Sequence, residues 1–75
     1  MIENKIRVAL TEIFKKQKIP KNIDNLKFGS FKNWDSLNHL NLLLLIEVRL
    51  KIKFTMTEMS EIKTIKGLLK IIRNK

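Results

Sequence analysis

The 75-residue chain contains no cysteine, a single proline, two glycines and one histidine. The absence of cysteine excludes disulfides and thiolate zinc sites, and one histidine is too few for a histidine-based site, so we predict no metal centre. The longest apolar run, LLLLI, is far shorter than the roughly 20 residues that cross a bilayer. The first residues also lack the apolar stretch of a signal peptide. We therefore expect a cytoplasmic protein without stable membrane insertion.

Acidic residues are scarce as well. Seven Asp and Glu oppose 16 Lys and Arg, which gives a net charge of +9. Such a surplus attracts anionic partners, namely acidic proteins, nucleic acid or lipid surfaces. The hydrophobic content of 44% is high enough for a packed core and argues against disorder. We predict a single domain that covers residues 1–75.

The apolar residues of the first 16 positions recur at steps of three and four, which predicts a helix over residues 2–16. Residues 17–35 then form a long connection that contains Pro20. Its apolar side chains predict that it folds back over the core with one short helical turn. We expect Trp34 to pack this loop onto the helices rather than to anchor a partner.

A second helix is expected from Asp35 or Ser36 to about Lys51, with two apolar sides. One side points inward and the other, with Leu37, Leu40 and Leu44, is expected to be exposed.

A capping-box pattern at Thr55 and Glu58 predicts a short third helix near residues 57–62, and Thr64 is expected to cap a fourth helix. The fourth helix should bury one apolar face and expose a lysine-rich one to solvent. The predicted fold is all-α: a small four-helix bundle with a long first loop and a short third helix.

Ser36 ends the long loop and opens the second helix. A serine at this place is usually a helix cap, which is the simpler interpretation. A hydroxyl at a helix N-terminus is also a good attachment point for a phosphate, because free N–H groups and the helix dipole favour an anion. Nothing in the chain makes Ser36 a nucleophile. His39 lies too close on the same helix for a catalytic triad with Asp35 and Ser36, and we expect it to be half-buried.

Asp35-Ser36-Leu37, at the junction of a long loop and a long helix, resembles the attachment motif of acyl carrier proteins and peptidyl carrier proteins. The resemblance extends over the whole chain and is strongest in residues 34–54. It implies that a phosphopantetheinyl transferase attaches 4′-phosphopantetheine from coenzyme A to Ser36. It also implies that the thiol of this arm carries an acyl or aminoacyl group as a thioester. Asp35 would help to position metal and transferase, and Leu37 would contact partners.

The same resemblance implies two further sets of residues. The partner surface would include Leu40, Asn41, Leu44, Glu47 and Val48. The core that receives a bound acyl chain would be lined by Leu43, Ile46, Phe54, Ile62, Leu68 and Leu69. Expected partners are the transferase, a loading ligase and a downstream transferase, and we expect the carrier to be a monomer.

One feature departs from the family. Typical members are strongly acidic along the second helix, whereas here Asn41, Val48 and Arg49 stand in that region. Charge complementarity governs partner choice, so we expect a specialised, non-enzymatic carrier whose partners are acidic or mainly apolar. The alternative is a small basic helical module that binds an anionic partner without a prosthetic group. Nucleic acid is not the expected partner, because no aromatic residues interleave the basic stripe.

Overall fold

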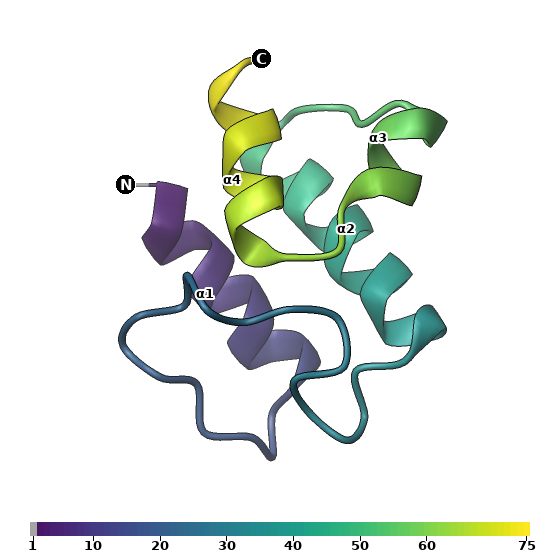
Figure 1. Cartoon of the computed structure of the whole chain (residues 1–75). Coiled ribbons are helices and arrows are strands. Elements are labelled where there is room, and N and C mark those ends of the chain that lie inside the picture. The colour runs from purple at the N-terminus through teal and green to yellow at the C-terminus, as the bar shows by residue number, and fades with distance from the viewer. Residues whose placement is uncertain (1) are drawn as a thin grey trace.

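The computed structural model of the protein describes residues 2–75, and this part of the chain contains four helices and no β-strand (Figure 1). The helices are α1 (Ile2–Ile13), α2 (Ser36–Leu50), α3 (Met56–Glu61) and α4 (Ile65–Arg73). The all-helical class, the long first loop and the short third helix are as predicted. No helix in residues 2–75 has the length and apolarity that a membrane crossing requires.

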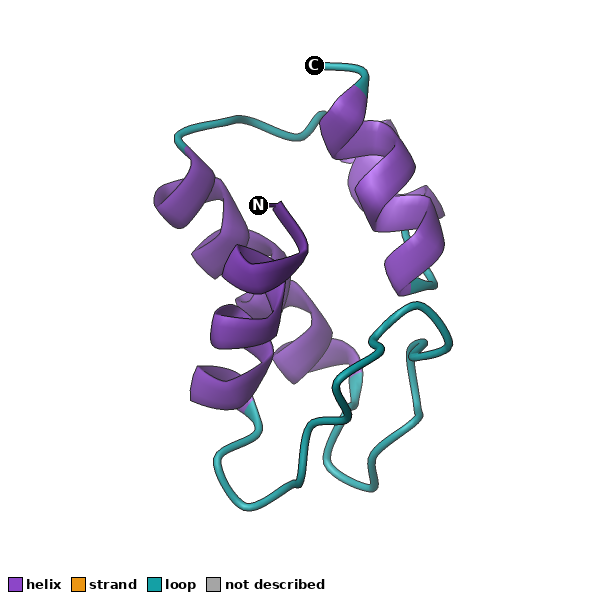
Figure 2. Ribbon diagram, turned by 90° about the vertical axis from the view of Figure 1, so that its left-hand side faces the viewer, coloured by secondary structure: helices purple, strands orange, loops and turns teal. Residues whose placement is uncertain are grey.

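The helices pack in a compact bundle in which α1 lies against α2 (Figures 1 and 2). The long loop crosses one end of this bundle, while the start of α1 and the end of α4 lie at the other (Figure 1). An ion pair between Arg73 and Glu3, 2.8 Å apart, joins these two ends, and Arg49 pairs with Glu12 between α2 and α1. Both pairs are solvent-exposed, so their contribution to stability is small.

The core is built from one apolar face of each long helix, α4 and parts of the loop. The predicted inner side of α2 is buried at Leu42, Leu43 and Ile46, whereas Leu50 is half-buried. The inner face of α4 is buried as predicted and consists of Ile65, Leu68, Leu69 and Ile72. Burial of these faces removes apolar surface from water, which is the main force that holds the helices together.

The predicted caps of the last two helices are present. Thr55 and Glu58 form the reciprocal capping box, with Thr55 Oγ1 3.0 Å from the Glu58 N–H. Thr64 Oγ1 accepts the N–H of Gly67 at 2.9 Å. The third helix begins one residue earlier than predicted, at Met56, because Thr55 is its N-cap.

The first helix is shorter than predicted and ends at Ile13 rather than near residue 16. Phe14 still donates its N–H to the Leu10 carbonyl, but Gln17 then donates to the Phe14 carbonyl at 2.9 Å and tightens the turn. Lys15 and Lys16 are exposed. Because no apolar side chain after Phe14 meets the core at helical spacing, packing does not extend the helix further.

The predicted helical turn in the loop is wrong, since residues 17–35 contain no helix. The loop instead makes separate turns, one of them at Gly29, whose φ of 90° suits glycine. It also forms a β-bridge between Lys27 and Thr64. The expected folding back over the core is confirmed, because Ile19, Ile23 and Trp34 are buried. Local turn bonds, together with backbone bonds from Leu26 and Phe28 to the start of α4 and the α3–α4 connection, replace the bonds of a helix here.

Candidate functional site

Asp35, and not Ser36, caps α2. The Asp35 backbone is extended, and its Oδ1 accepts the N–H of Asn38 at 2.9 Å. Its carbonyl accepts the N–H of His39 at 2.8 Å, which is the first bond of the helix. The interpretation of Ser36 as a simple cap therefore loses its structural basis, since the capping oxygen belongs to the preceding residue.

The Ser36 hydroxyl is exposed, and within residues 2–75 it takes part in no hydrogen bond. It lies in the first turn of a 15-residue helix. The first N–H groups of a helix have no partner inside it, and this end carries a partial positive charge. A phosphate ester on Ser36 would thus meet a favourable electrostatic environment without breaking an existing contact.

Alanine at each of these two positions should separate capping from the free hydroxyl. We expect Asp35→Ala to lower the free energy of unfolding by about 1 kcal/mol, because the Asn38 N–H loses its acceptor. Ser36→Ala should change it by less than about 0.5 kcal/mol. Urea denaturation of the two variants measures both values. A larger loss for Ser36→Ala than for Asp35→Ala would contradict the assignment of the cap.

The end of the loop is held on both sides of Asp35. Asn38 donates from its side chain to the Asn33 carbonyl at 2.7 Å. Trp34, only 3% exposed, packs against the rings of Phe14 and Phe31 at centroid distances of 5.0 and 5.7 Å. The prediction that Trp34 packs the loop onto the helices is confirmed. Ser36 therefore projects from a well-anchored junction.

His39 is more deeply buried than predicted, with 9% of its surface exposed. Trp34 Nε1 donates to His39 Nδ1 at 2.9 Å, and His39 Nε2 lies 2.7 Å from the Ile62 carbonyl. Burial lowers the pKa of His39 below its ordinary value of 6.5, the Ile62 carbonyl opposes this, and the Lys63 charge adds to the lowering. Both ring nitrogens are occupied, so His39 does not serve Ser36 as a base.

The second apolar side of α2 is exposed, as predicted. Leu37, Leu40, Leu44 and Val48, called here the outer apolar row, are between 44% and 72% exposed. Asn41 is exposed beside them. Glu47 is half-buried, and its Oε2 accepts the N–H of Phe54 at 2.7 Å, so this carboxylate holds the segment after α2. An apolar row of this kind on a helix is typical of a contact surface.

The six residues expected to line an acyl pocket all belong to the core. Leu43, Ile46, Phe54, Ile62, Leu68 and Leu69 are each at most 8% exposed. They come from α2, the connection after it, the end of α3 and α4, so the fold does bring them together. Three surface hollows of the molecule are lined by other residues. A chain that entered the core would have to separate side chains that pack together here.

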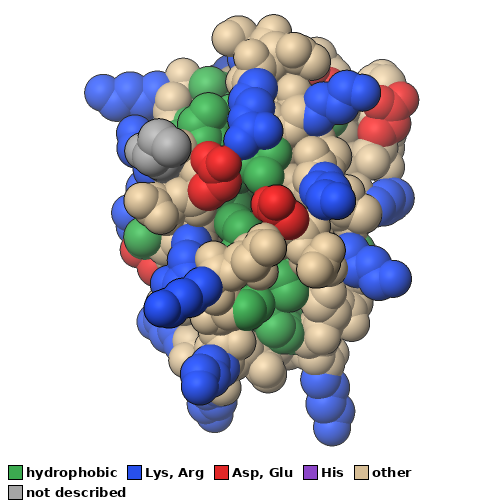
Figure 3. Space-filling view, turned by 60° about the vertical axis from the view of Figure 1, so that its left-hand side comes forward, with side chains coloured by type: hydrophobic (Ala, Val, Ile, Leu, Met, Phe, Trp, Pro, Cys, Tyr) green, Lys and Arg blue, Asp and Glu red, His purple; other side chains and the backbone are tan. Residues whose placement is uncertain are grey.

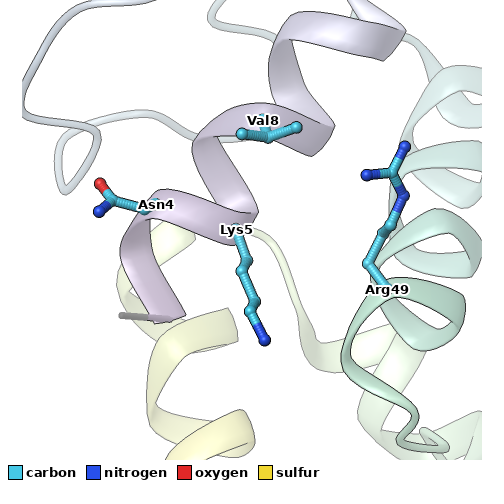
Figure 4. Close-up of a pocket in the computed structure, with 4 residues that line it drawn as sticks. All are labelled: Asn4, Lys5, Val8 and Arg49. Carbon is cyan, nitrogen blue, oxygen red and sulfur yellow. The ribbon is translucent and has the colours of Figure 1, made fainter.

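One of these hollows lies between α1 and the last turn of α2, at the end of α2 opposite Ser36 (Figure 4). It measures about 410 Å³ and is lined by Asn4, Lys5, Val8 and Arg49. Arg49 is already paired with Glu12. About 20 Å of helix separates this hollow from Ser36, so it is no part of the same site.

The basic composition appears on the surface. In Figure 3, Lys and Arg side chains surround scattered hydrophobic ones on the face that is visible, with few acidic side chains. On α4, Lys66 and Lys70 are exposed as predicted. Of the cations near the chain end, Arg73 and Lys75 pair with Glu3 and Glu58. Most Lys and Arg side chains of residues 2–75 therefore form no ion pair with an acidic side chain, and the positive potential of the surface attracts anions.

The hydrogen-bond chain from Trp34 through His39 to Ile62 was not predicted from the sequence. Trp34 and His39 are five residues apart, a spacing that bridges the loop and the helix and follows no regular period. The acceptor on Ile62 is a backbone carbonyl, which leaves no mark in the sequence. The only hint in the sequence is that the single tryptophan and the single histidine lie close together, around the start of the second helix.

Comparisons with family models, with curated proteins and with solved structures found no match to this chain. The function is therefore argued from the residues and their geometry.

Proposed function

We propose that this protein is a non-enzymatic acyl carrier, modified at Ser36 with 4′-phosphopantetheine that is transferred from coenzyme A. The observation that carries the proposal is the free, exposed hydroxyl of Ser36 between Asp35 and Leu37, at the start of α2. Since Asp35 supplies the cap, the hydroxyl has no structural task there. Transfer of phosphopantetheine in vitro tests the proposal, with Ser36→Ala as the matched control.

Ser36 Oγ would hold the group through a phosphodiester: it would bond to the β-phosphate of coenzyme A, lose its proton to a base of the transferase, and adenosine 3′,5′-bisphosphate would leave. The transferase supplies the chemistry, because no base in residues 2–75 is bonded to Ser36. The second carboxylate oxygen of Asp35 remains available to the metal of that enzyme. The positive end of α2 favours the phosphodiester that results.

The outer apolar row is the proposed partner surface, together with Asn41 and Glu47. It begins directly beside Ser36, at Leu37, and continues along α2 to Val48. An enzyme that docks on this row can reach the arm at Ser36. Apolar contacts supply the affinity of such a surface, and the surrounding charges decide which partner binds and how fast. The cations of this protein favour transferases and ligases with acidic or mainly apolar docking sites.

The charge of α2 should control how fast a transferase built for acidic carriers acts. We expect the double variant Asn41→Glu and Val48→Glu to be modified about tenfold faster, since it restores acidic residues on the docking face. Both positions are exposed, so the core is unaffected. Initial rates of phosphopantetheine transfer, followed by mass at low salt, measure the effect.

A matched control places the same change of charge on another helix. Lys66→Gln and Lys70→Gln together also lower the net charge by two, but on the outer face of α4. If this control accelerates the reaction as much as the α2 variant, net charge and not the docking face is responsible. Equal rates for wild type and the α2 variant would reject the role of charge altogether.

A second candidate function follows from the net charge of +9 alone. In this alternative the protein is a basic helical module that binds an anionic protein, and Ser36 has no special role. The two candidates differ in their response to Ser36→Ala, which abolishes carrier activity but leaves anion binding intact. Salt-dependent binding of an acidic protein by Ser36→Ala, without modification of wild type, would support the alternative.

A further inference from the structure

The hydrogen bonds of His39 require one form of its ring. The indole N–H of Trp34 can only donate, and the carbonyl of Ile62 can only accept. His39 must therefore keep a lone pair at Nδ1 and a proton at Nε2. This is a neutral tautomer, and an imidazolium cannot make the bond to Trp34. The structure of this junction thus depends on a neutral histidine, a side chain whose ordinary pKa is 6.5.

His39 joins the end of the long loop, the start of α2 and the end of α3, and the last of these is 23 residues away in the sequence. Trp34 ends the long loop, His39 lies in α2, and Ile62 is the C-cap of α3. The ring of Phe28, also from the loop, meets the His39 ring edge-on at 4.8 Å. Next to it, Phe28 donates its N–H to the Lys63 carbonyl at 2.8 Å, and Ile65 donates to the Leu26 carbonyl at 3.0 Å. The loop and the α3–α4 connection therefore close against each other at His39.

The surroundings of His39 disfavour a positive charge. From the loop it meets the uncharged rings of Phe28 and Trp34, which bury it, and only the Ile62 carbonyl at the end of α3 favours the protonated ring. The charged group that acts on it is Lys63 of the α3–α4 connection, which is positive. On its own helix, the Asp35 carboxylate is turned to the Asn38 N–H at the surface. No carboxylate is bonded to the ring, so the positive charge of a protonated His39 has no anionic partner there.

We propose that the Trp34–His39–Ile62 chain is an acid-opened clasp, in which protonation of His39 Nδ1 releases the loop from α2 while the helices stay folded. The proton comes from solvent and occupies the lone pair that accepted the Trp34 N–H. The Trp34 N–H then meets another donor, and Phe28, with its backbone bond to the Lys63 carbonyl, loses the support of the His39 ring. The buried apolar faces of α1, α2 and α4 lie in the same core cluster as Trp34, and we expect those faces to hold the helices together without the His39 bond. The segment that opens is the one directly before Asp35 and Ser36, and the clasp is independent of the carrier proposal.

The sign of the pH dependence follows from the lowered pKa of His39. Above the ordinary value of 6.5 the ring is neutral in both folded and unfolded chains, and the clasp contributes fully. As the pH falls below 6.5, His39 is protonated in the open form before it is protonated in the closed form. The free energy that favours the closed form therefore decreases, until the pH is below the lowered pKa of His39 in the closed form. The opening should therefore occur at mildly acidic pH, below 6.5.

Trp34 is the only tryptophan of the chain, so its fluorescence reports on the clasp directly. A titration from about pH 7.5 to about pH 4.5 covers the histidine range. We expect a reversible shift of the emission with a midpoint below 6.5, while far-UV helicity is retained. Amide exchange at Phe28 and Ile65, corrected for its intrinsic pH dependence, should accelerate with the same midpoint.

Two variants test the cause. His39→Gln keeps a neutral donor and acceptor without titrating in this range, and it should abolish the transition. Lys63→Gln removes the neighbouring charge and should move the midpoint to higher pH, a result that remains informative if His39→Gln does not fold. The proposal is overturned if neither variant changes the transition. It is also overturned if helicity is lost at the same midpoint, since that is global acid unfolding.

Discussion

Incubation with coenzyme A, magnesium and a broad-specificity phosphopantetheinyl transferase is expected to add one phosphopantetheine group to the wild-type protein and none to Ser36→Ala. The physical reason is the state of the Ser36 hydroxyl, which is exposed, makes no hydrogen bond in residues 2–75 and lies at the positive end of α2. Intact mass before and after incubation gives the result. We expect no mass gain at all for Ser36→Ala, because this variant lacks the oxygen atom that accepts the phosphopantetheine group.

The controls make this experiment decisive. Ser60→Ala removes another exposed hydroxyl, which bonds only to the Thr57 carbonyl, and should be modified like wild type. Far-UV circular dichroism should show the same helicity for all three proteins. A folded wild type that gains no mass contradicts modification by this transferase. If the variant with Glu at positions 41 and 48 also gains none, the carrier proposal fails and the basic-module alternative remains.

Phe14→Ala is expected to lower the free energy of unfolding by about 3–5 kcal/mol. Phe14 is completely buried and is the point where α1, the loop and the aromatic cluster meet. Its ring packs edge-on against Phe31 at a centroid distance of 5.3 Å and at a tilt against Trp34 at 5.0 Å. Truncation leaves a cavity that these rings cannot fill without moving the loop. A loss of this size is comparable with the whole stability of a small domain.

Two further variants keep this prediction measurable. Phe14→Leu preserves most of the volume and should cost less than Phe14→Ala, about 1–2 kcal/mol, so it stays folded if the alanine variant does not. Phe28→Ala, at a ring that is 37% exposed, should cost less than Phe14→Ala. Urea denaturation at pH 7 compares all four proteins. If Phe28→Ala is as damaging as Phe14→Ala, the centre of the loop packing has been assigned to the wrong ring.

Much of the fold could be predicted from local patterns. The spacing of the apolar residues in α1, α2 and α4 identifies each helix, because burial of one face repeats every three or four residues. Thr55 and Thr64 mark helix starts, since capping is a contact between residues three positions apart. The exposed row of Leu37, Leu40 and Leu44 could also be predicted, because a helix that is apolar on two sides cannot bury both in a small bundle.

The predictions that were wrong concern features that depend on contacts between residues far apart in the sequence. The loop makes separate local turns, and its middle is held by backbone bonds from Leu26 and Phe28 to Ile65 and Lys63, which are far away in the sequence. The first helix ends early because the next buried residue, Ile19, lies five positions after Phe14, which is not a spacing that continues the same helical face. The burial of His39 depends on contacts with Phe28 and with the Ile62 carbonyl, and the place of His39 in the sequence does not indicate either contact.

For the candidate site too, some features could be predicted from the sequence and others depend on the tertiary structure. From the order of its residues, the chain is a small basic helical protein with an Asp-Ser-Leu junction before its longest helix, because composition and helix-start chemistry are properties of neighbouring residues. The three-dimensional arrangement assigns the cap to Asp35, leaves the Ser36 hydroxyl free and commits both nitrogens of His39 to Trp34 and Ile62. Those assignments depend on which atoms meet after the chain has folded, and buried polar groups must find partners wherever the packing places them.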